Sequence, residues 1–124
     1  MSTRVDADEQ ALEQPAPQPE LPLCCAACGQ PITRRCWAQQ QLGQHEHTFR
    51  NPHGYSFHLL CFQQAPGCRV EGPPTAEASW FPGTRWQFAL CQGCDTHLGW
   101  HYCGRECFFG LIATRLTHRQ TQSG

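Results

Sequence analysis

Two Cys-x-x-Cys pairs constrain the fold of this chain more than any other feature. They are Cys25-Ala26-Ala27-Cys28, followed by Gly29, and Cys91-Gln92-Gly93-Cys94. A Cys-x-x-Cys turn lets two thiolates point to one centre, and zinc prefers four tetrahedral ligands. The sequence therefore predicts one closed zinc site with the ligands Cys25, Cys28, Cys91 and Cys94. Residues 29–90 separate the pairs, so this metal would join the beginning and the end of one domain.

A redox pair or unrelated thiols are the alternative, and a single Cys-x-x-Cys would leave that question open. Two pairs favour a structural Zn²⁺ ion that contributes directly to the free energy of folding. A chain of 124 residues forms one domain at most. Its core would be marginal, so a staple of this kind is expected. Cys24 competes with Cys25 as a ligand, but only Cys25 has the spacing of the second pair.

The remaining cysteines are predicted to be free, buried thiols, because free cysteine often behaves as a small apolar residue. They are Cys24, Cys36, Cys61, Cys68, Cys103 and Cys107. His101, Cys103 and Cys107 could hold a second metal, but no ligand spacing supports one. His45 and His47 would share one face of a strand, and we interpret them as solvated side chains.

The N-terminus and the charge exclude several classes of function. "MSTRVDADEQALEQPAPQPELP" has neither a basic nor an apolar signal-peptide region, and no apolar run approaches the ~20 residues that span a bilayer. We therefore expect a cytoplasmic protein with reduced thiols and no membrane association. All nine basic side chains are arginine and the net charge is −1. This argues against nucleic-acid binding, and the absence of lysine excludes Schiff-base chemistry.

Composition divides the chain into three parts. Residues 1–22 are acidic and rich in glutamine and proline, which predicts a disordered tail. Residues 23–118 form the predicted domain, and residues 119–124 a short frayed end.

Within the predicted domain the patterns are those of strands and turns. "YSFHLLCF" (55–62) and "RWQFALC" (85–91) are rich in aromatic and aliphatic residues, and the second alternates with the strand period. Asn51-Pro52-His53-Gly54, Pro73-Pro74 and Pro82-Gly83 are predicted turns. "FFGLIATRL" (108–116) fits a strand or a helix. The predicted class is mostly β.

Three of the four tryptophans fall in "SWFPGTRWQFALCQGCDTHLGWHY" (79–102), around the second cysteine pair. If residues 97–102 are a strand, Trp100 and Tyr102 point to one face, where Trp80 and Trp86 could join them. The residues alone leave two interpretations open, a packed core and a binding cage. A cage could hold a quaternary ammonium by cation–π attraction or a flat ring by stacking. The nearby Glu77 mildly favours a cation.

The motifs "C..CG..I..R", "NPHGY", "SWFPG..W", "C..C..HLGW.Y" and "FFGL" occur here in this order. Together they resemble the thalidomide-binding CULT domain of cereblon, and the chain is similar in form to bacterial single-domain cereblon homologues. The resemblance covers roughly residues 23–117. It implies a β-tent of two antiparallel sheets pinned by one structural zinc on the four cysteines named above.

The resemblance also implies a non-enzymatic binding function. The guests would be cyclic imides: glutarimides of the thalidomide type, hydantoins, uracil-like rings and C-terminal cyclic imides of damaged proteins. Trp80, Trp86 and Trp100 would form the cage and Tyr102 would close one side. Backbone groups from Ala78 through Ser79 to Trp80 would meet the imide edge, and Asn51 would line the mouth.

The sequence departs from the family at two points. Ala78 stands where the animal proteins carry histidine, which removes a side-chain hydrogen bond but leaves the backbone contact. No Lon-like domain and no ubiquitin-ligase adaptor region precede the matching part, so only ligand binding is expected to transfer.

Two other functions compete with imide binding. One is a B-type methionine sulfoxide reductase, whose zinc knuckle resembles "CQGCDTHLGWHY" and whose nucleophile would be a late cysteine. Cys107, in "RECFF", and Cys103, in "HYCGR", both lack the Arg-x-Cys-x-Asn setting of those enzymes. The other is an aromatic-cage reader of quaternary ammonium groups or methylated side chains.

Overall fold

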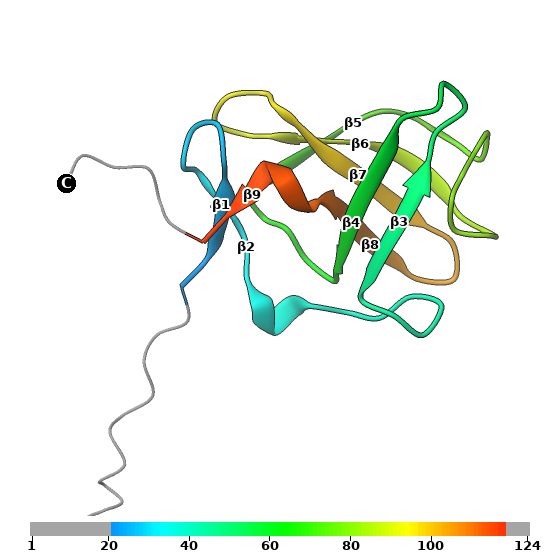
Figure 1. Cartoon of the computed structure of the whole chain (residues 1–124), viewed down its shortest axis with the longest axis horizontal. Helices are drawn as coiled ribbons and strands as arrows, with labels where there is room; N and C mark the ends of the chain where they lie inside the picture. Colours follow the sequence, from blue (N-terminus) through cyan, green and yellow to red (C-terminus); the bar gives the residue numbers. More distant parts are fainter. Residues whose placement is uncertain (1–20, 119–124) are drawn as a thin grey trace, which may run out of the picture.

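The computed structural model describes residues 21–118 as two antiparallel sheets. The small sheet has the order β2-β1-β9, with β1 Leu23–Cys25, β2 Pro31–Thr33 and β9 Leu116–Thr117. The large sheet has the order β3-β4-β8-β7-β6-β5. Its strands are β3 Glu46–Arg50, β4 Ser56–Phe62, β5 Cys68–Thr75, β6 Arg85–Cys91, β7 His97–Cys103 and β8 Cys107–Ile112. Figure 1 shows the small sheet at one end of the large one.

The predicted class, mostly β with two antiparallel sheets, is confirmed. The described residues form no α-helix, only the short 3₁₀ turns η1 Arg35–Trp37 and η2 Ala113–Arg115. Residues 1–20 of the predicted tail and the predicted frayed end, 119–124, lie outside the described residues. No helix between residues 21 and 118 is long and apolar enough to cross a membrane.

The turn prediction at Asn51 is confirmed, and its geometry explains the hairpin between β3 and β4. The Asn51 side-chain oxygen accepts the backbone N–H groups of His53 and Tyr55, at 3.0 and 2.9 Å. Gly54 has a φ of 93°, which glycine adopts at no steric cost. The side chain thereby fixes the loop that carries residues 51–53.

The prediction of a turn at Pro73-Pro74 is wrong, because both prolines belong to β5. β5 is the edge strand of the large sheet and pairs only with β6. Its pairing is interrupted between Glu71 and Thr75. Proline lacks the N–H that an inner ladder needs, so an irregular edge strand can hold two prolines where a central strand could not.

The undecided segment 108–116 is resolved by its neighbours. β8 lies in the middle of the large sheet between β4 and β7, and the chain then turns through η2 into β9. Two buried clusters result. One joins the two sheets and includes Leu23, Ile32, Phe62, Leu98 and Leu111. The other includes Leu59, Cys61, Phe81, Tyr102, Phe108 and Ile112, and the three tryptophans pack against it.

The prediction of free, buried thiols holds for three cysteines and fails for three. Cys24, Cys61 and Cys68 are buried thiols, whereas Cys36 is exposed. Cys103 and Cys107 form a disulfide, which corrects their interpretation as thiols. Sequence spacing did not show this pairing, because it depends on the register in which β7 and β8 face one another, Cys103 opposite Cys107.

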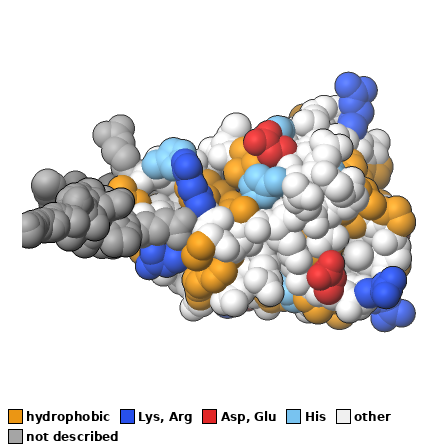
Figure 2. All heavy atoms as spheres, turned by 90° about the horizontal axis from the view of Figure 1, so that it is seen from below, with side chains coloured by type: hydrophobic (Ala, Val, Ile, Leu, Met, Phe, Trp, Pro, Cys, Tyr) orange, Lys and Arg blue, Asp and Glu red, His pale blue; other side chains and the backbone are white. Residues whose placement is uncertain are grey.

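Charged side chains are dispersed over one face of the molecule. On the face drawn in Figure 2, arginines and acidic residues lie scattered among apolar and uncharged ones, and no continuous basic stripe crosses it. This distribution agrees with the near-neutral composition.

Candidate metal centre and aromatic pocket

The two Cys-x-x-Cys pairs come together at the junction of the sheets. Cys25 and Cys28 flank the turn from β1 to β2, and Cys91 and Cys94 flank the turn from β6 to β7. These two turns, blue and yellow, lie side by side in Figure 1. The Sγ atoms of Cys25, Cys28, Cys91 and Cys94 all lie within 4.8 Å of one another. The group of four predicted from the sequence is therefore assembled from both sheets.

The two knuckles share one backbone pattern. In the first, the N–H of Gly29 donates to the Cys25 carbonyl and the N–H of Cys25 donates to the Gln30 carbonyl. In the second, Asp95 donates to Cys91, and Cys91 to Thr96. Gly29 and Asp95 occupy the equivalent position, both with positive φ, 83° and 66°. The similarity of the two pairs in sequence thus extends to their geometry.

The spacing of the sulfur atoms fits a tetrahedral metal ion. Cys25 Sγ lies 3.8 Å from Cys94 Sγ, and Cys28 Sγ lies 3.6 Å from Cys91 Sγ. Ligands of a tetrahedral site with Zn–S bonds of about 2.3 Å are about 3.8 Å apart. Gly93 leaves room for this cluster, since a Cβ atom there would lie 3.3 Å from Cys28 Sγ. The four cysteines could therefore hold a metal ion, and their donor set suits zinc.

The thiols of the second knuckle differ in acidity. Hydrogen bonds from the side chain and backbone of Thr96, the first at 2.9 Å, lower the pKa of Cys94 to about 7. Burial raises the pKa of Cys91 to about 12. A metal bound here would have to displace a tightly held proton from Cys91, so its binding would release protons.

A second feature is an aromatic pocket of about 360 Å³ on the large sheet. It is lined by Asn51, Pro52, His53, Ala78, Trp80, Trp86, Phe88, Trp100 and Tyr102. Six of the seven residues predicted to bind a ligand are among them. Ser79 is not, and its hydroxyl bonds the Thr84 side chain, at 2.7 Å, and the Phe81 carbonyl. Its role is to hold the 79–84 turn.

The register between β6 and β7 explains why the aromatic walls of the pocket lie together. β6 and β7 are adjacent, with Trp86 opposite Tyr102 and Phe88 opposite Trp100. Opposed residues in antiparallel strands point to the same face, so four aromatic side chains share one side of the sheet. The loop 76–80 brings the third indole, that of Trp80, over them.

The indole rings are held by specific contacts. The Trp86 indole N–H donates to the Glu77 carbonyl at 2.9 Å, which ties β6 to the loop before Trp80. Trp80 and Trp100 meet edge to face, with ring centroids 5.1 Å apart. Phe57 packs against both rings, and Phe49 stacks on Trp80 at 5.2 Å. These contacts fix the walls of the pocket relative to one another.

Tyr102 forms the buried floor of the pocket. Its ring stacks on Phe108 and meets Phe81 edge to face. Burial raises the pKa of the phenol well above its ordinary value. Ala78, at the rim, has a φ of 56°, an unusual conformation for a residue other than glycine. Such strain is common where a backbone group must face a ligand.

Sequence reasoning missed three lining residues. Phe88 was recognised only as part of a strand pattern, and Pro52 and His53 only as part of a turn. Phe88 is 42% exposed, far more than a packed aromatic side chain would be. The available signal was its spacing, two residues after Trp86 on the same strand face.

The chemistry of the lining residues bears on the rival functions. None of the residues that line this pocket carries a carboxylate or a thiol. Glu77 contributes its backbone carbonyl to Trp86 and lies outside the lining. Cys103 and Cys107 are joined to each other and also lie outside it.

These features define an all-β protein with a four-cysteine group suited to zinc and an aromatic pocket. The chain matches chicken (Gallus gallus) cereblon with 36% identity over 75 residues, 56% of this chain and 17% of that protein. Cereblon of Xenopus tropicalis is 42% identical over 75 residues, with the same shares. Cereblon of Danio rerio is 40% identical over 52 residues, 42% of this chain and 12% of that protein. No family model matches the chain.

Over the matched segment the chain is thus similar in sequence to cereblon, as its motifs indicated. It spans less than a fifth of the length of these curated relatives.

Proposed function

We propose that this chain is a small-molecule binding domain that holds cyclic imides in the aromatic pocket, around a structural zinc site. The observation that carries the proposal is the convergence of three half-buried indoles on one cavity. About 360 Å³ is at the small end of the ~300–1,000 Å³ range of ligand sites. A five- or six-membered imide ring is a suitably small and flat guest.

Each part of the pocket has a task in this proposal. The indoles of Trp80, Trp86 and Trp100 contact the faces and edges of the ring, while Tyr102 supplies the floor. An imide edge presents acceptor, donor, acceptor, and backbone groups at Ala78 and Trp80 are its proposed partners. Asn51 and His53 stand at the mouth, where a substituent on the ring, such as the rest of a protein chain, would leave. Glutarimides, hydantoins, uracil-like rings and C-terminal cyclic imides share this edge.

Zinc is proposed as the ion at Cys25, Cys28, Cys91 and Cys94. Bound there, it would cross-link the first knuckle to the β6–β7 turn. Two walls of the pocket, Trp86 and Trp100, lie on those same strands. Preorganised walls avoid the ordering cost of binding.

The side chains that line the pocket favour imide binding over the two rival functions. A cage for quaternary ammonium groups gains from a nearby carboxylate, and a sulfoxide reductase needs a thiol at the substrate. The residues that line the pocket offer neither. We propose no catalytic residue and no nucleic-acid or membrane partner.

The test is a calorimetric titration of the zinc-loaded protein with glutarimide, with uracil and choline in parallel. A ring of about eight heavy atoms at roughly 0.7–1 kcal/mol per atom gives dissociation constants of about 1–80 μM. Trp86→Ala should weaken binding several-fold to a hundredfold, and Trp86→Phe less. Trp37→Phe, which changes the tryptophan outside the pocket, is the matched control and should leave binding unchanged.

Three results would contradict the proposal. If the protein binds choline but gives no heat of binding with glutarimide, the pocket is a cage for cations. Turnover of a methionine sulfoxide substrate would indicate the reductase. If the folded, zinc-loaded protein binds none of these ligands, the tryptophans have a purely structural role.

A further inference from the structure

A second cluster of side chains that can bind a metal lies beside the turn that connects β7 to β8. Cys103 and Cys107 face one another in register, with their Cα atoms 4.0 Å apart, and are joined as a disulfide. His101 is two residues before Cys103 on the same strand and therefore on the same face. One ligand atom from each of His101, Cys103 and Cys107 lies within 4.8 Å of the other two.

The His101 ring lies beside the sulfur atom of Cys103. Its Nδ1 and Nε2 atoms lie 3.9 and 4.0 Å from Cys103 Sγ. Among residues 21–118 these are the only hydrogen-bonding contacts of its ring nitrogens. Phe109, opposite on β8, packs against the ring with centroids 4.5 Å apart. The imidazole is thus positioned by packing and has a nitrogen free to bind a ligand.

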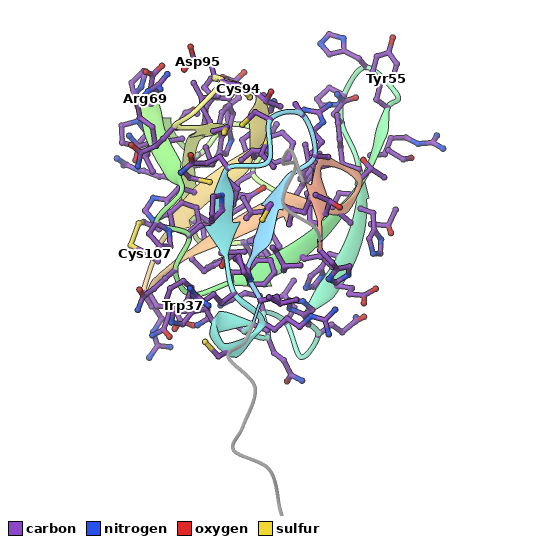
Figure 3. All side chains as sticks on the ribbon, turned by 90° about the vertical axis from the view of Figure 1, so that its left-hand side faces the viewer. Trp37, Tyr55, Arg69, Cys94, Asp95 and Cys107 are labelled. Carbon is purple, nitrogen blue, oxygen red and sulfur yellow. A yellow bond between two sulfur atoms is a disulfide. The ribbon has the colours of Figure 1, made fainter. Side chains whose placement is uncertain are left out.

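This cluster is separate from both sites described above. It occupies the end of β7 remote from the four-cysteine group, and Figure 3 shows Cys94 and Cys107 well apart, with the disulfide beside the second label. Residues 101 and 103 also point away from the pocket, because Trp100 and Tyr102 occupy the other face of the strand. None of the three residues lines the aromatic pocket.

We propose that His101, Cys103 and Cys107 form a second, redox-controlled zinc site, which opens when the disulfide is reduced. A dithiol or phosphine reductant supplies two electrons, two protons are taken up, and the S–S bond is replaced by two thiols. Zinc then binds both sulfurs as thiolates, with release of two protons, and the neutral His101 imidazole supplies a third ligand. Water completes the tetrahedron, because the cluster is partly exposed.

Two considerations support reduction as a normal state of this pair. The proposed zinc group of Cys25, Cys28, Cys91 and Cys94 requires thiols, so the protein must function where thiols persist. Cys107 is exposed, which allows a reductant to attack the disulfide directly. After reduction, side-chain rotation can bring the two sulfurs to the separation of about 3.8 Å that a tetrahedral zinc site needs.

The test compares the oxidised protein with protein reduced by a phosphine, which is removed by desalting under inert gas. Each form is saturated with zinc, freed of loosely bound metal and analysed for bound zinc by mass spectrometry. We expect one zinc per chain in the oxidised protein and two in the reduced protein. Substitution with Co²⁺ should add a second thiolate-to-cobalt absorption only after reduction.

Variants assign the ligands. Cys103→Ser, Cys107→Ser and His101→Asn should each remove the second zinc and leave the first. Cys36→Ser and His58→Asn change an exposed cysteine and an exposed histidine outside both clusters, and both should keep two zinc ions. Near-ultraviolet circular dichroism checks that each variant is folded.

Other outcomes would overturn the proposal. If the fully reduced protein binds one zinc only, the pair is a disulfide without a metal function. If the second zinc survives Cys103→Ser or Cys107→Ser, it lies elsewhere. If it survives His101→Asn with unchanged affinity, the three-residue ligand set is wrong.

Discussion

Phe88 differs from the other aromatic side chains in being exposed over 42% of its surface while its ring packs against Trp86, with centroids 5.2 Å apart. Its ring therefore forms a wall of the pocket and contributes little buried surface to the core. Phe88→Ala should weaken imide binding about two- to tenfold, since one aromatic contact contributes roughly 0.5–1.5 kcal/mol. Calorimetry with glutarimide measures the effect.

The matched control for Phe88 is Tyr55→Ala, which removes an aromatic ring that is 68% exposed and outside the pocket lining. It should leave binding unchanged. Equal effects of the two substitutions, or none from Phe88→Ala, would contradict a wall at Phe88.

Cys61 is a buried thiol whose acidity links stability to pH. Burial raises the pKa of Cys61 to about 12, above its ordinary value of 9.0. Between these values the folded state keeps the proton and the unfolded chain releases it. The unfolded state then binds fewer protons, so the free energy of unfolding falls as pH rises above about 9. One such group contributes a slope of at most about 1.4 kcal/mol per pH unit.

Urea unfolding at pH 8, 9, 10 and 11 measures this slope. Cys61→Ala should be less stable at pH 8 but should lose less stability between pH 9 and 11. The buried phenol of Tyr102, whose pKa is also raised, adds a slope of the same sign in both proteins. Parallel pH profiles for the two proteins would show that Cys61 does not titrate as its burial implies.

At the scale of elements, β7 connects the proposed sites and depends on a close approach to β8. A Cβ atom on Gly99 would lie 2.1 Å from the Gly110 carbonyl oxygen and 2.8 Å from Leu111 Cα. Both are backbone atoms, so no side-chain motion relieves the clash. Gly99→Ala should lower the free energy of unfolding by several kcal/mol or prevent folding, because the centre of the large sheet must separate.

Gly83→Ala is the comparison for Gly99→Ala. Gly83 has a φ of 80° but open space around its Cα, so only local strain of about 1 kcal/mol is expected. Thermal unfolding of both variants measures the difference. A Gly99→Ala protein as stable as Gly83→Ala would contradict the close packing of β7 on β8.

At the scale of the whole molecule, the four-cysteine group joins two sheets that otherwise share one modest core. Removal of zinc by a strong chelator should abolish the near-ultraviolet circular dichroism and lower the melting temperature by tens of degrees. The physical reason is that structural zinc contributes about 10–16 kcal/mol in small zinc domains, comparable with the whole stability of a domain.

Cys28→Ser should reproduce the effect of chelation, whereas Cys36→Ser, outside the group, should not. Zinc added back to the chelated protein should restore the fold and, if the proposed function holds, glutarimide binding. An apo protein with unchanged melting temperature would show that the group is not a structural metal site.

The sequence by itself determined the composition of the four-cysteine group and the fold class. Ligand spacing is a local property, so the pairs at residues 25–28 and 91–94 could be recognised without a structure. The strand period and the motifs that match cereblon are also local. The Asn51 turn was predictable for the same reason, since its side chain bonds its own loop.

Tertiary structure decided what depends on register. The pairing of Cys103 with Cys107, and the approach of His101 to them, follow from the alignment of β7 and β8. Phe88 lines the pocket because β6 places it opposite Trp100 in β7, and the Ser79 hydroxyl bonds Thr84 in its own turn. Pro73 and Pro74 belong to a strand because β5 lies at the edge of the large sheet, where the missing N–H groups are tolerated. A sequence records which neighbours a residue has along the chain, but the hydrogen-bonded register between strands chooses its neighbours in space.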